Sequence, residues 1–181
     1  MREVGIDLTL AADLARAIRD VADFPRPGIA FKDITPVLLD AALFRRTTDA
    51  LAQAFRAAGV THVLGIESRG FIFGAPVAHA LEVGFVPLRK PGKLPHTRVS
   101  ERYDLEYGSD ALEVHQDALG AGDRALIIDD LLATGGTAAA ALRLVARCGA
   151  EVAGVGAVID LSFLPWRERL KGCTVQTLVS Y

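Results

Sequence analysis

Apolar residues recur along the chain at two spacings, one typical of helices and one typical of strands. Near the amino terminus, Leu14, Ile18 and Val21 fall at helical spacing, and the prolines at positions 25 and 27 are expected to end that helix. Residues 24–38, which follow, contain three prolines and a glycine and are predicted to be irregular and extended.

A second helix is predicted from Asp40 to about Ala58. Asp40 is a suitable N-cap, because its carboxylate can accept hydrogen bonds from the first free N–H groups of a helix. Gly59 is a suitable end. Four residues share one face of this helix and are expected to be buried: Leu43, Thr47, Leu51 and Phe55.

From residue 61 onward, strands and helices are predicted to alternate. The expected strands are residues 61–66, 84–88, 111–115, 124–129, 151–161 and 174–181, and the expected helices are residues 70–81 and 138–147. Residues 111–115 alternate as a half-exposed strand does, whereas 124–129 are nearly all apolar, as in a central parallel strand. The fold class is therefore α/β, with a mostly parallel central sheet flanked by helices, and ligands are expected beyond the carboxyl ends of the strands.

Composition limits the class of protein further. The chain has 181 residues, of which 51% are hydrophobic, so residues 1–181 are expected to form a single domain. A formal net charge of −2 gives no reason to expect nucleic acid or a membrane as partner. Cys148 and Cys173 have no metal-binding spacing and are expected to be free thiols in a reducing cytosol. The start of the chain does not resemble a secretory signal, and the most apolar window, residues 71–88, is interrupted by polar residues, glycine and proline. A cytoplasmic protein is expected.

The strand predicted at 124–129 leads into two adjacent acids, Asp129 and Asp130, and then into Ala133-Thr134-Gly135-Gly136-Thr137. Backbone N–H groups, two hydroxyls and the start of a helix can together bind a phosphate. The carboxylates upstream can accept hydrogen bonds from sugar hydroxyls or lie beside a hydrated Mg²⁺. The stretch therefore predicts a site for a phosphorylated sugar. The alternative is a tight turn with solvated acids.

Two further loops carry groups that bind anions. Ser68, Arg69 and Gly70 follow the strand predicted at 61–66 and offer a hydroxyl, a guanidinium group and a flexible backbone. A basic run follows the strand predicted at 84–88 and comprises Arg89, Lys90, Lys93, Arg98 and Arg102. Such a run is often only a solvated face. Here it follows a strand of the same sheet, so its charge is predicted to face the two anion-binding loops.

The polar passage from 91 to 107 is long for a loop within a small α/β domain and is predicted to be a mobile lid. Glu106 lies within it and could be carried into a closed site; the alternative is an exposed hairpin acid. Other nucleotide motifs fail. No GxxxxGK[ST] is present, and "GAGDRA" at 120–125 precedes its strand instead of following it, so it is predicted to be a turn.

The stretch "IIDDLLATGGT" resembles the phosphoribosyl-pyrophosphate-binding motif of the type I phosphoribosyltransferases. Four further segments, in the same order, are similar to the adenine-specific branch of that family: "DFPRPGIAFKDITPVL", "GIESRGFIFGAPVA", "VPLRKPGKLP" and "YDLEYGSDALEVHQDAL". The resemblance covers almost the whole chain. It implies the type I fold with an N-terminal base-binding hood of about residues 1–37. It also implies transfer of the 5-phosphoribosyl group to adenine, giving AMP and pyrophosphate, with Mg²⁺ as cofactor, in purine salvage by a homodimer.

The resemblance also implies roles for individual residues. Glu106 and Arg69 are expected to be catalytic, and Glu106 to handle a proton of the base. Asp129 and Asp130 would engage the ribose hydroxyls, with Mg²⁺ nearby held mainly by substrate and water and not directly by protein side chains. Residues 133–137 would bind the 5-phosphate. The expected pyrophosphate-binding residues are Ser68, Arg69, Arg89, Lys90 and Lys93, and the expected adenine-binding residues are Ala30, Phe31, Lys32 and Leu161.

Three questions stay open at the level of sequence: the role of Lys32, the choice of base, and whether the protein is an enzyme or a sensor. Lys32 stands where relatives often have Arg, and the two side chains are not equivalent at a bidentate contact. Base choice depends on few contacts, so another purine is an alternative substrate. A non-catalytic sensor of the activated sugar on the same fold is the alternative from a different class. The four histidines form no ligand cluster, and only His96, in the basic run, is a candidate to face the site.

Overall fold

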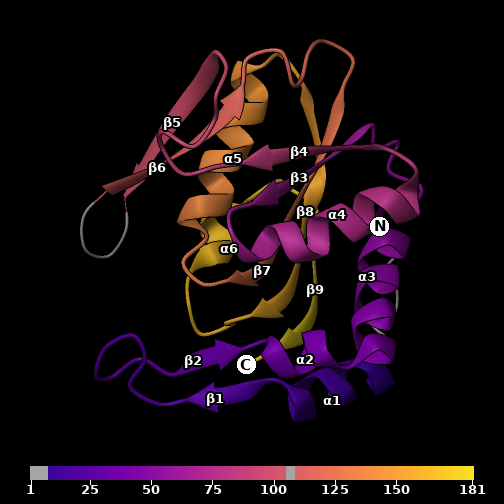
Figure 1. The fold of residues 1–181 in the computed structure, drawn as a ribbon, viewed down its shortest axis with the longest axis vertical. Helices are drawn as coiled ribbons and strands as arrows, with labels where there is room; N and C mark the ends of the chain where they lie inside the picture. The colour runs from indigo at the N-terminus through magenta and orange to yellow at the C-terminus, as the bar shows by residue number, and fades with distance from the viewer. Residues whose placement is uncertain (1–7, 105–108) are drawn as a thin grey trace.

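Five parallel strands form the central sheet of the computed structural model, which describes residues 8–104 and 109–181. Their order across the sheet is β4-β3-β7-β8-β9 (Figure 1). The strands are β3 (His62–Ile66), β4 (Gly84–Leu88), β7 (Arg124–Leu132), β8 (Glu151–Asp160) and β9 (Val175–Ser180). The prediction of an α/β fold with a parallel sheet is confirmed, and the five strands lie within two residues of the predicted bounds except at the end of β7.

Helices cover both faces of this sheet. Because side chains alternate along a strand, Val63 and Leu126 pack toward α3 (Ala41–Phe55) and α4 (Arg69–Leu81). Their neighbours Leu64 and Ile127 pack toward α5 (Gly136–Arg147) on the other face. The sheet is thus buried on both sides, as its continuous apolar runs predict.

The N-cap predicted for α3 is present. The carboxylate of Asp40 accepts hydrogen bonds from the N–H groups of Ala42 and Leu43, both at 3.0 Å. The helix ends at Phe55 and not at Ala58, and the residues predicted for its buried face are all buried. Gly59 follows with a φ of +65°, a backbone conformation that favours glycine.

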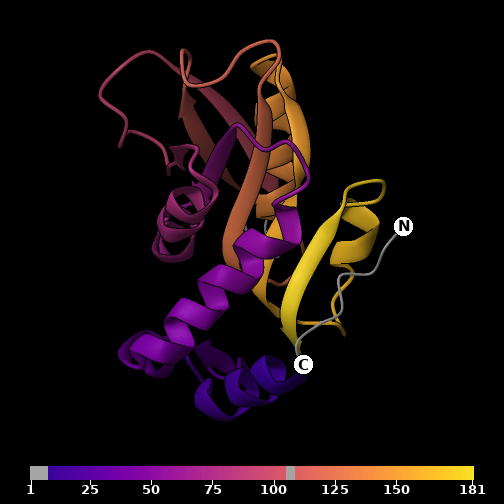
Figure 2. The ribbon, with the colours of Figure 1, turned by 90° about the vertical axis from the view of Figure 1, so that its right-hand side faces the viewer.

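The amino-terminal prediction was wrong in two places. The first helix, α1, spans Leu8–Ala17, so Val21 lies beyond it in β1 (Arg19–Val21). This strand pairs antiparallel with β2 (Phe31–Asp33), within the segment expected to be irregular, and the short helix α2 (Thr35–Leu39) follows. The helical spacing of Val21 was misleading because that residue instead faces Phe31 across the two strands. This small unit lies at one end of the sheet, and α3 runs from it along the sheet (Figure 2).

Part of the passage expected to be a lid loop, residues 98–104, is the first strand of a β-hairpin. Its strands are β5 (Arg98–Asp104) and β6 (Ser109–His115), and residues 105–108 lie outside the described structure. The half-exposed pattern expected at 111–115 was also wrong, since four consecutive residues from 111 to 114 are buried. Glu113 is buried because its carboxylate is paired, with Arg98 at 3.0 Å and with the N–H of Gly92 at 3.0 Å.

The sequence did not predict α6 (Trp166–Arg169). Cys148 and Cys173 are free thiols, as expected, and burial raises the pKa of both. Within residues 8–104 and 109–181, no helix has the length and apolar character needed to cross a membrane.

Candidate active site

The site lies where β7 extends past its neighbour β3. The last residue of β3 paired with β7 is Gly65, opposite Ile128, whereas β7 continues beside β8 as far as Leu132. The expected end of this strand at Asp129 was therefore too early. Chain order also reverses here, since β4 lies on one side of β3 and β7 on the other. Such a switch point leaves a crevice at the carboxyl ends of the strands.

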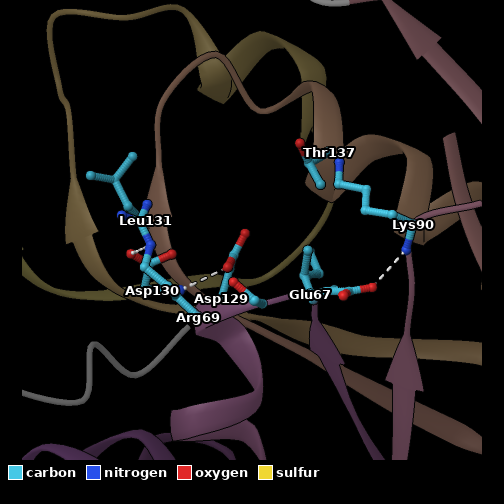
Figure 3. A pocket seen from close by; sticks show the side chains of 9 residues that line it. Glu67, Arg69, Lys90, Asp129, Asp130, Leu131 and Thr137 are labelled. Atoms are coloured by element: carbon cyan, nitrogen blue, oxygen red, sulfur yellow. Dashed lines mark hydrogen bonds and ion pairs between the residues drawn. The ribbon is translucent and has the colours of Figure 1, made fainter. Parts of the chain in front are cut away.

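A cavity of about 430 Å³ occupies this crevice. Figure 3 shows Asp129, Asp130 and Arg69 grouped together, with Glu67 and Lys90 on the other side and Thr137 at the start of α5. The lining residues are Ile66, Glu67, Ser68, Arg69, Lys90, Asp129, Asp130, Leu131 and Thr137. The structure thus brings together the acid pair, the Ser68-Arg69 loop, one residue of the phosphate loop and one residue of the basic run.

The surroundings of Asp129 and Asp130 disfavour the charged forms of both side chains. Burial, reinforced by the neighbouring charge of Asp130, raises the pKa of Asp129 well above its ordinary value. Burial also raises the pKa of Asp130, although the charge of Arg69 opposes this effect. The two residues are linked by a 2.9 Å hydrogen bond from the N–H of Asp130 to the carboxylate of Asp129. Raised pKa values in a cleft are typical of functional carboxylates.

Arg69 connects the acid pair to the amino-terminal unit. Its Nε lies 2.8 Å from Oδ2 of Asp130, and its guanidinium carbon lies 4.9 Å from the centre of the Phe31 ring. Gly70 allows this approach, because a Cβ at that position would lie 2.7 Å from the carbonyl oxygen of Ile128. Phe31, expected to contact a base, is therefore a neighbour of the residues expected to bind a sugar.

The phosphate loop predicted at 133–137 joins β7 to α5. Its backbone turns through Gly135, which has a φ of +76° and would place a Cβ only 3.0 Å from the Cβ of Trp166. Glycine is required there on both grounds. No side chain caps the start of α5, so the N–H groups of its first turn are left to bind an anion.

Glu67 is a site residue that the sequence reasoning missed. It receives hydrogen bonds from Lys93 Nζ at 2.7 Å, from Arg89 at 3.3 Å and from the backbone N–H of Lys90 at 2.9 Å. Burial alone would raise its pKa, but these hydrogen bonds outweigh burial and lower the pKa from 4.5 to about 2. The signal was present in the sequence as an acid next to Ser68, one strand away from a basic run. The Glu67–Ser68 peptide bond is cis.

The basic run divides into two groups. Lys90 lines the cavity, and Arg89 and Lys93 form ion pairs with Glu67, which also lines it. Arg98 instead pairs with the buried Glu113. Arg102 lines a separate cavity of about 440 Å³ together with Gly136 of the phosphate loop. The prediction that the whole run faces the anion-binding loops was therefore wrong for Arg98, which pairs with Glu113 instead.

The expected base-binding residues occupy two places. Ala30 is exposed just before β2, and Phe31 makes an edge-to-face contact with Phe24 at 5.0 Å. Lys32 forms an ion pair with Asp20 at 2.5 Å and lies 3.4 Å from the centre of the Tyr181 ring. Leu161 is half-buried directly after β8, and its N–H donates to the carbonyl of Leu132.

Two candidates remain, Glu106 and His96. Glu106 lies outside the described residues. The ring of His96 packs against that of His115 at 6.1 Å, and His96 is not among the residues that line the cavity. Within the described part of the chain, no group of three or more His, Cys, Asp or Glu side chains is arranged to hold a metal ion.

A crevice at the carboxyl ends of parallel strands that combines an acid pair, a glycine-containing loop before a helix and clustered cations is typical of proteins that bind an activated sugar phosphate. Comparison with known proteins agrees with that class. The model of the phosphoribosyl transferase domain matches residues 38–162. The adenine phosphoribosyltransferase of Myxococcus xanthus is 57% identical over 97% of this chain and 95% of its own length.

Solved structures give the same result. The adenine phosphoribosyltransferase of Rhodothermus marinus has a TM-score of 0.92 and 51% identity, covering 97% of this chain and all of its own. That of Saccharomyces cerevisiae, in complex with D-2,5-dideoxy-2,5-imino-altritol 1,6-bisphosphate and adenine, has a TM-score of 0.89 and 41% identity over 94% of this chain and 99% of its own. The chain belongs to the phosphoribosyl transferase family, in its adenine phosphoribosyltransferase branch.

Proposed function

We propose that this chain transfers the 5-phosphoribosyl group of phosphoribosyl pyrophosphate to adenine, giving AMP and pyrophosphate in purine salvage. The observation that carries the proposal is the double contact of Arg69, with Asp130 at 2.8 Å and with the Phe31 ring at 4.9 Å. It joins a candidate base contact to the candidate sugar site. The names of the relatives and the adenine bound in the yeast structure support the same substrate.

The mechanism follows from charge. The bond between the anomeric carbon and pyrophosphate breaks while an imidazole nitrogen of adenine bonds to that carbon. Negative charge then develops on the leaving pyrophosphate and positive charge on the ribose. Arg89, Lys90 and Lys93 would stabilise the leaving group, and Asp129 and Asp130 would bind the ribose hydroxyls; Lys90, Asp129 and Asp130 line the cavity, and Arg89 and Lys93 contact Glu67 beside it. The N–H groups at the start of α5 would hold the 5-phosphate and so fix the sugar in place.

Mg²⁺ is part of the proposal, and the residues present fit a hydrated ion. Asp129 and Asp130 both line the cavity, and a cation beside them would stabilise their charged forms, which burial disfavours. We propose that the ion is held mainly by substrate oxygens and water. When bound, the ion would supply positive charge at the pyrophosphate.

The decisive experiment measures turnover of the purified protein with phosphoribosyl pyrophosphate, Mg²⁺ and either adenine, hypoxanthine or guanine in parallel. We expect AMP and pyrophosphate from adenine and far slower reaction of the other two bases. Faster turnover of hypoxanthine would overturn the choice of base alone. Binding of the donor with no turnover of any base would favour a sensor over an enzyme.

Glu106 is proposed to accept the proton from the second imidazole nitrogen of adenine. A general base typically contributes about 10²-fold or more to the rate, so Glu106→Gln should lower kcat by at least that factor and leave binding of phosphoribosyl pyrophosphate unchanged. A pH profile of kcat for both proteins checks the assignment. An unchanged profile in Glu106→Gln would sink the proton role.

A homodimer in the cytoplasm completes the proposal. The candidate interface is at α4 and the edge strand β4: the ring centroids of Phe71 and Phe85 lie 6.0 Å apart, and Ile72, next to Phe71 in the sequence, is 37% exposed. A second copy would cover this area. Light scattering on the parent and on Ile72→Glu tests the dimer, because the added charge should give monomers.

The proposed cytoplasmic location follows from the charge of the donor. Phosphoribosyl pyrophosphate is a polyanion that cannot cross an apolar bilayer unaided, which favours the compartment where metabolites are phosphorylated.

A further inference from the structure

Lys90 is held by two residues of the β5–β6 hairpin. Its Nζ lies 2.6 Å from the hydroxyl of Tyr103 and 2.5 Å from Oδ2 of Asp110. Tyr103 and Asp110 are direct partners across the two strands, so their side chains leave the hairpin on the same face. The three residues therefore form one contact between the loop after β4 and the hairpin.

This contact fixes the charge of Lys90 as well as its position. Burial alone would lower the pKa of Lys90, but the hydrogen bonds with Asp110 and Tyr103 outweigh it and raise the pKa. Burial would likewise raise the pKa of Asp110, and the hydrogen bond from Lys90 is the main reason that its pKa is lowered instead. The pair consequently stays an ammonium and a carboxylate at neutral pH.

Lys90 lines the 430 Å³ cavity as well, on the side opposite the acid pair (Figure 3). An ammonium group has three N–H donors. Two are accounted for by Tyr103 and Asp110, which leaves the third for a ligand in the cavity. A lysine side chain normally loses rotamer freedom when its head is fixed on a ligand. Here the hairpin has already removed much of that freedom.

We propose that Tyr103 and Asp110 are positioning residues for the pyrophosphate end of the donor. They hold the ammonium of Lys90 at the cavity wall and act on the substrate only through it. The inference rests on the proposed function, because that function assigns Lys90 to the leaving group. A donor that is oriented in advance stabilises developing charge better than one that must be ordered during the reaction.

The test is a double-mutant cycle. Asp110→Ala, Asp110→Asn and Tyr103→Phe are made in the parent and again in a Lys90→Met background. Asp117→Ala, the loss of an exposed acid that follows the same hairpin, serves as the matched control. The measurements are kcat, KM for both substrates, and the Kd of pyrophosphate by calorimetry. Melting temperatures identify any variant that fails to fold.

In the parent background, Asp110→Ala should raise the KM for phosphoribosyl pyrophosphate and the Kd of pyrophosphate about tenfold, with KM for adenine unchanged. Asp110→Asn keeps an oxygen acceptor and should lose less. In the Lys90→Met background the same changes should have no further effect.

Two results would overturn the proposal. An equal loss in the Lys90→Met background would show that Asp110 supports the hairpin and does not act through Lys90. Unchanged or tighter pyrophosphate binding in Asp110→Ala would show that Asp110 does not position Lys90 or that it competes with the anion. A parent that binds pyrophosphate but converts no adenine would overturn the proposed function alone, and calorimetry would still decide the role of Asp110.

Discussion

Glu67 and Asp129 face the same cavity, yet their surroundings affect them in opposite directions. Glu67 receives hydrogen bonds from Arg89, Lys93 and the N–H of Lys90, which lower its pKa to about 2. Asp129 is linked to the N–H of Asp130, but burial and a second negative charge raise its pKa. Glu67 therefore stabilises the fold as an anion, whereas ionisation of Asp129 lowers the stability of the fold. We interpret Glu67 as a carboxylate that holds the site together and Asp129 as a carboxylate that serves to bind a ligand.

The largest expected effect is on catalysis. Asp129→Asn keeps the shape of the side chain and removes its charge, so it should lower kcat/KM for phosphoribosyl pyrophosphate by about 100-fold. Steady-state kinetics with adenine at saturation measure the change, and Asp117→Asn, at an exposed position, is the control. Activity equal to that of the parent would show that Asp129 does not bind the ribose. The contrast between Asp129 and Glu67 would then have no functional basis.

Glu67→Gln should change stability with pH. A folded-state pKa below the unfolded value of 4.5 contributes stability that is present above pH 4.5 and is lost as pH falls toward about 2. The variant should therefore be less stable than the parent by roughly 2 kcal/mol at pH 7, and the difference should shrink in acid. Urea denaturation at pH 7, 5 and 3 follows it. A difference that does not vary with pH would mean that packing, and not charge, holds Glu67.

The smallest effect has the opposite sign. A folded-state pKa raised above the unfolded value of 3.8 favours the fold below pH 3.8, and this advantage is lost as pH rises. Asp129→Asn should therefore be more stable than the parent by about 1 kcal/mol at pH 7 and equal to it near pH 3. Thermal unfolding without ligands at both pH values measures this. A less stable variant at pH 7 would show that the carboxylate is well solvated or paired.

The sequence predicted the parts of the fold that depend on local patterns. Continuous apolar runs gave β3, β7 and β8, and the Asp40 cap gave the start of α3. Strands with many polar residues were harder to predict. β5 was missed because its charged side chains point to partners distant in sequence, as Glu101 does to Arg143 at 2.6 Å. Val21 was misplaced because one apolar residue suits both a helix and a strand.

The site was predictable where one stretch of chain carries the chemistry. Asp129, Asp130 and the loop at 133–137 are contiguous, so their association could be read from the sequence. The contact of Arg69 with both Asp130 and Phe31 joins three separate segments and depends on the approach that Gly70 permits. Glu67 was missed for a similar reason, since its importance comes from cations that only the folded chain places beside it.

Trp166 is the single tryptophan of the chain, and it lies behind the phosphate loop. A Cβ on Gly135 would lie 3.0 Å from the Cβ and 3.1 Å from the Cα of Trp166, which is closer than ordinary van der Waals contact. The indole N–H of Trp166 donates to the buried Asp160 at 2.5 Å. Indole emission is sensitive to nearby charge and to the rigidity of its surroundings. Intrinsic fluorescence should therefore report filling of the loop by a 5-phosphate, with no label and no contribution from another tryptophan. Titration with ribose 5-phosphate would then separate binding at this end of the donor from events at the pyrophosphate end.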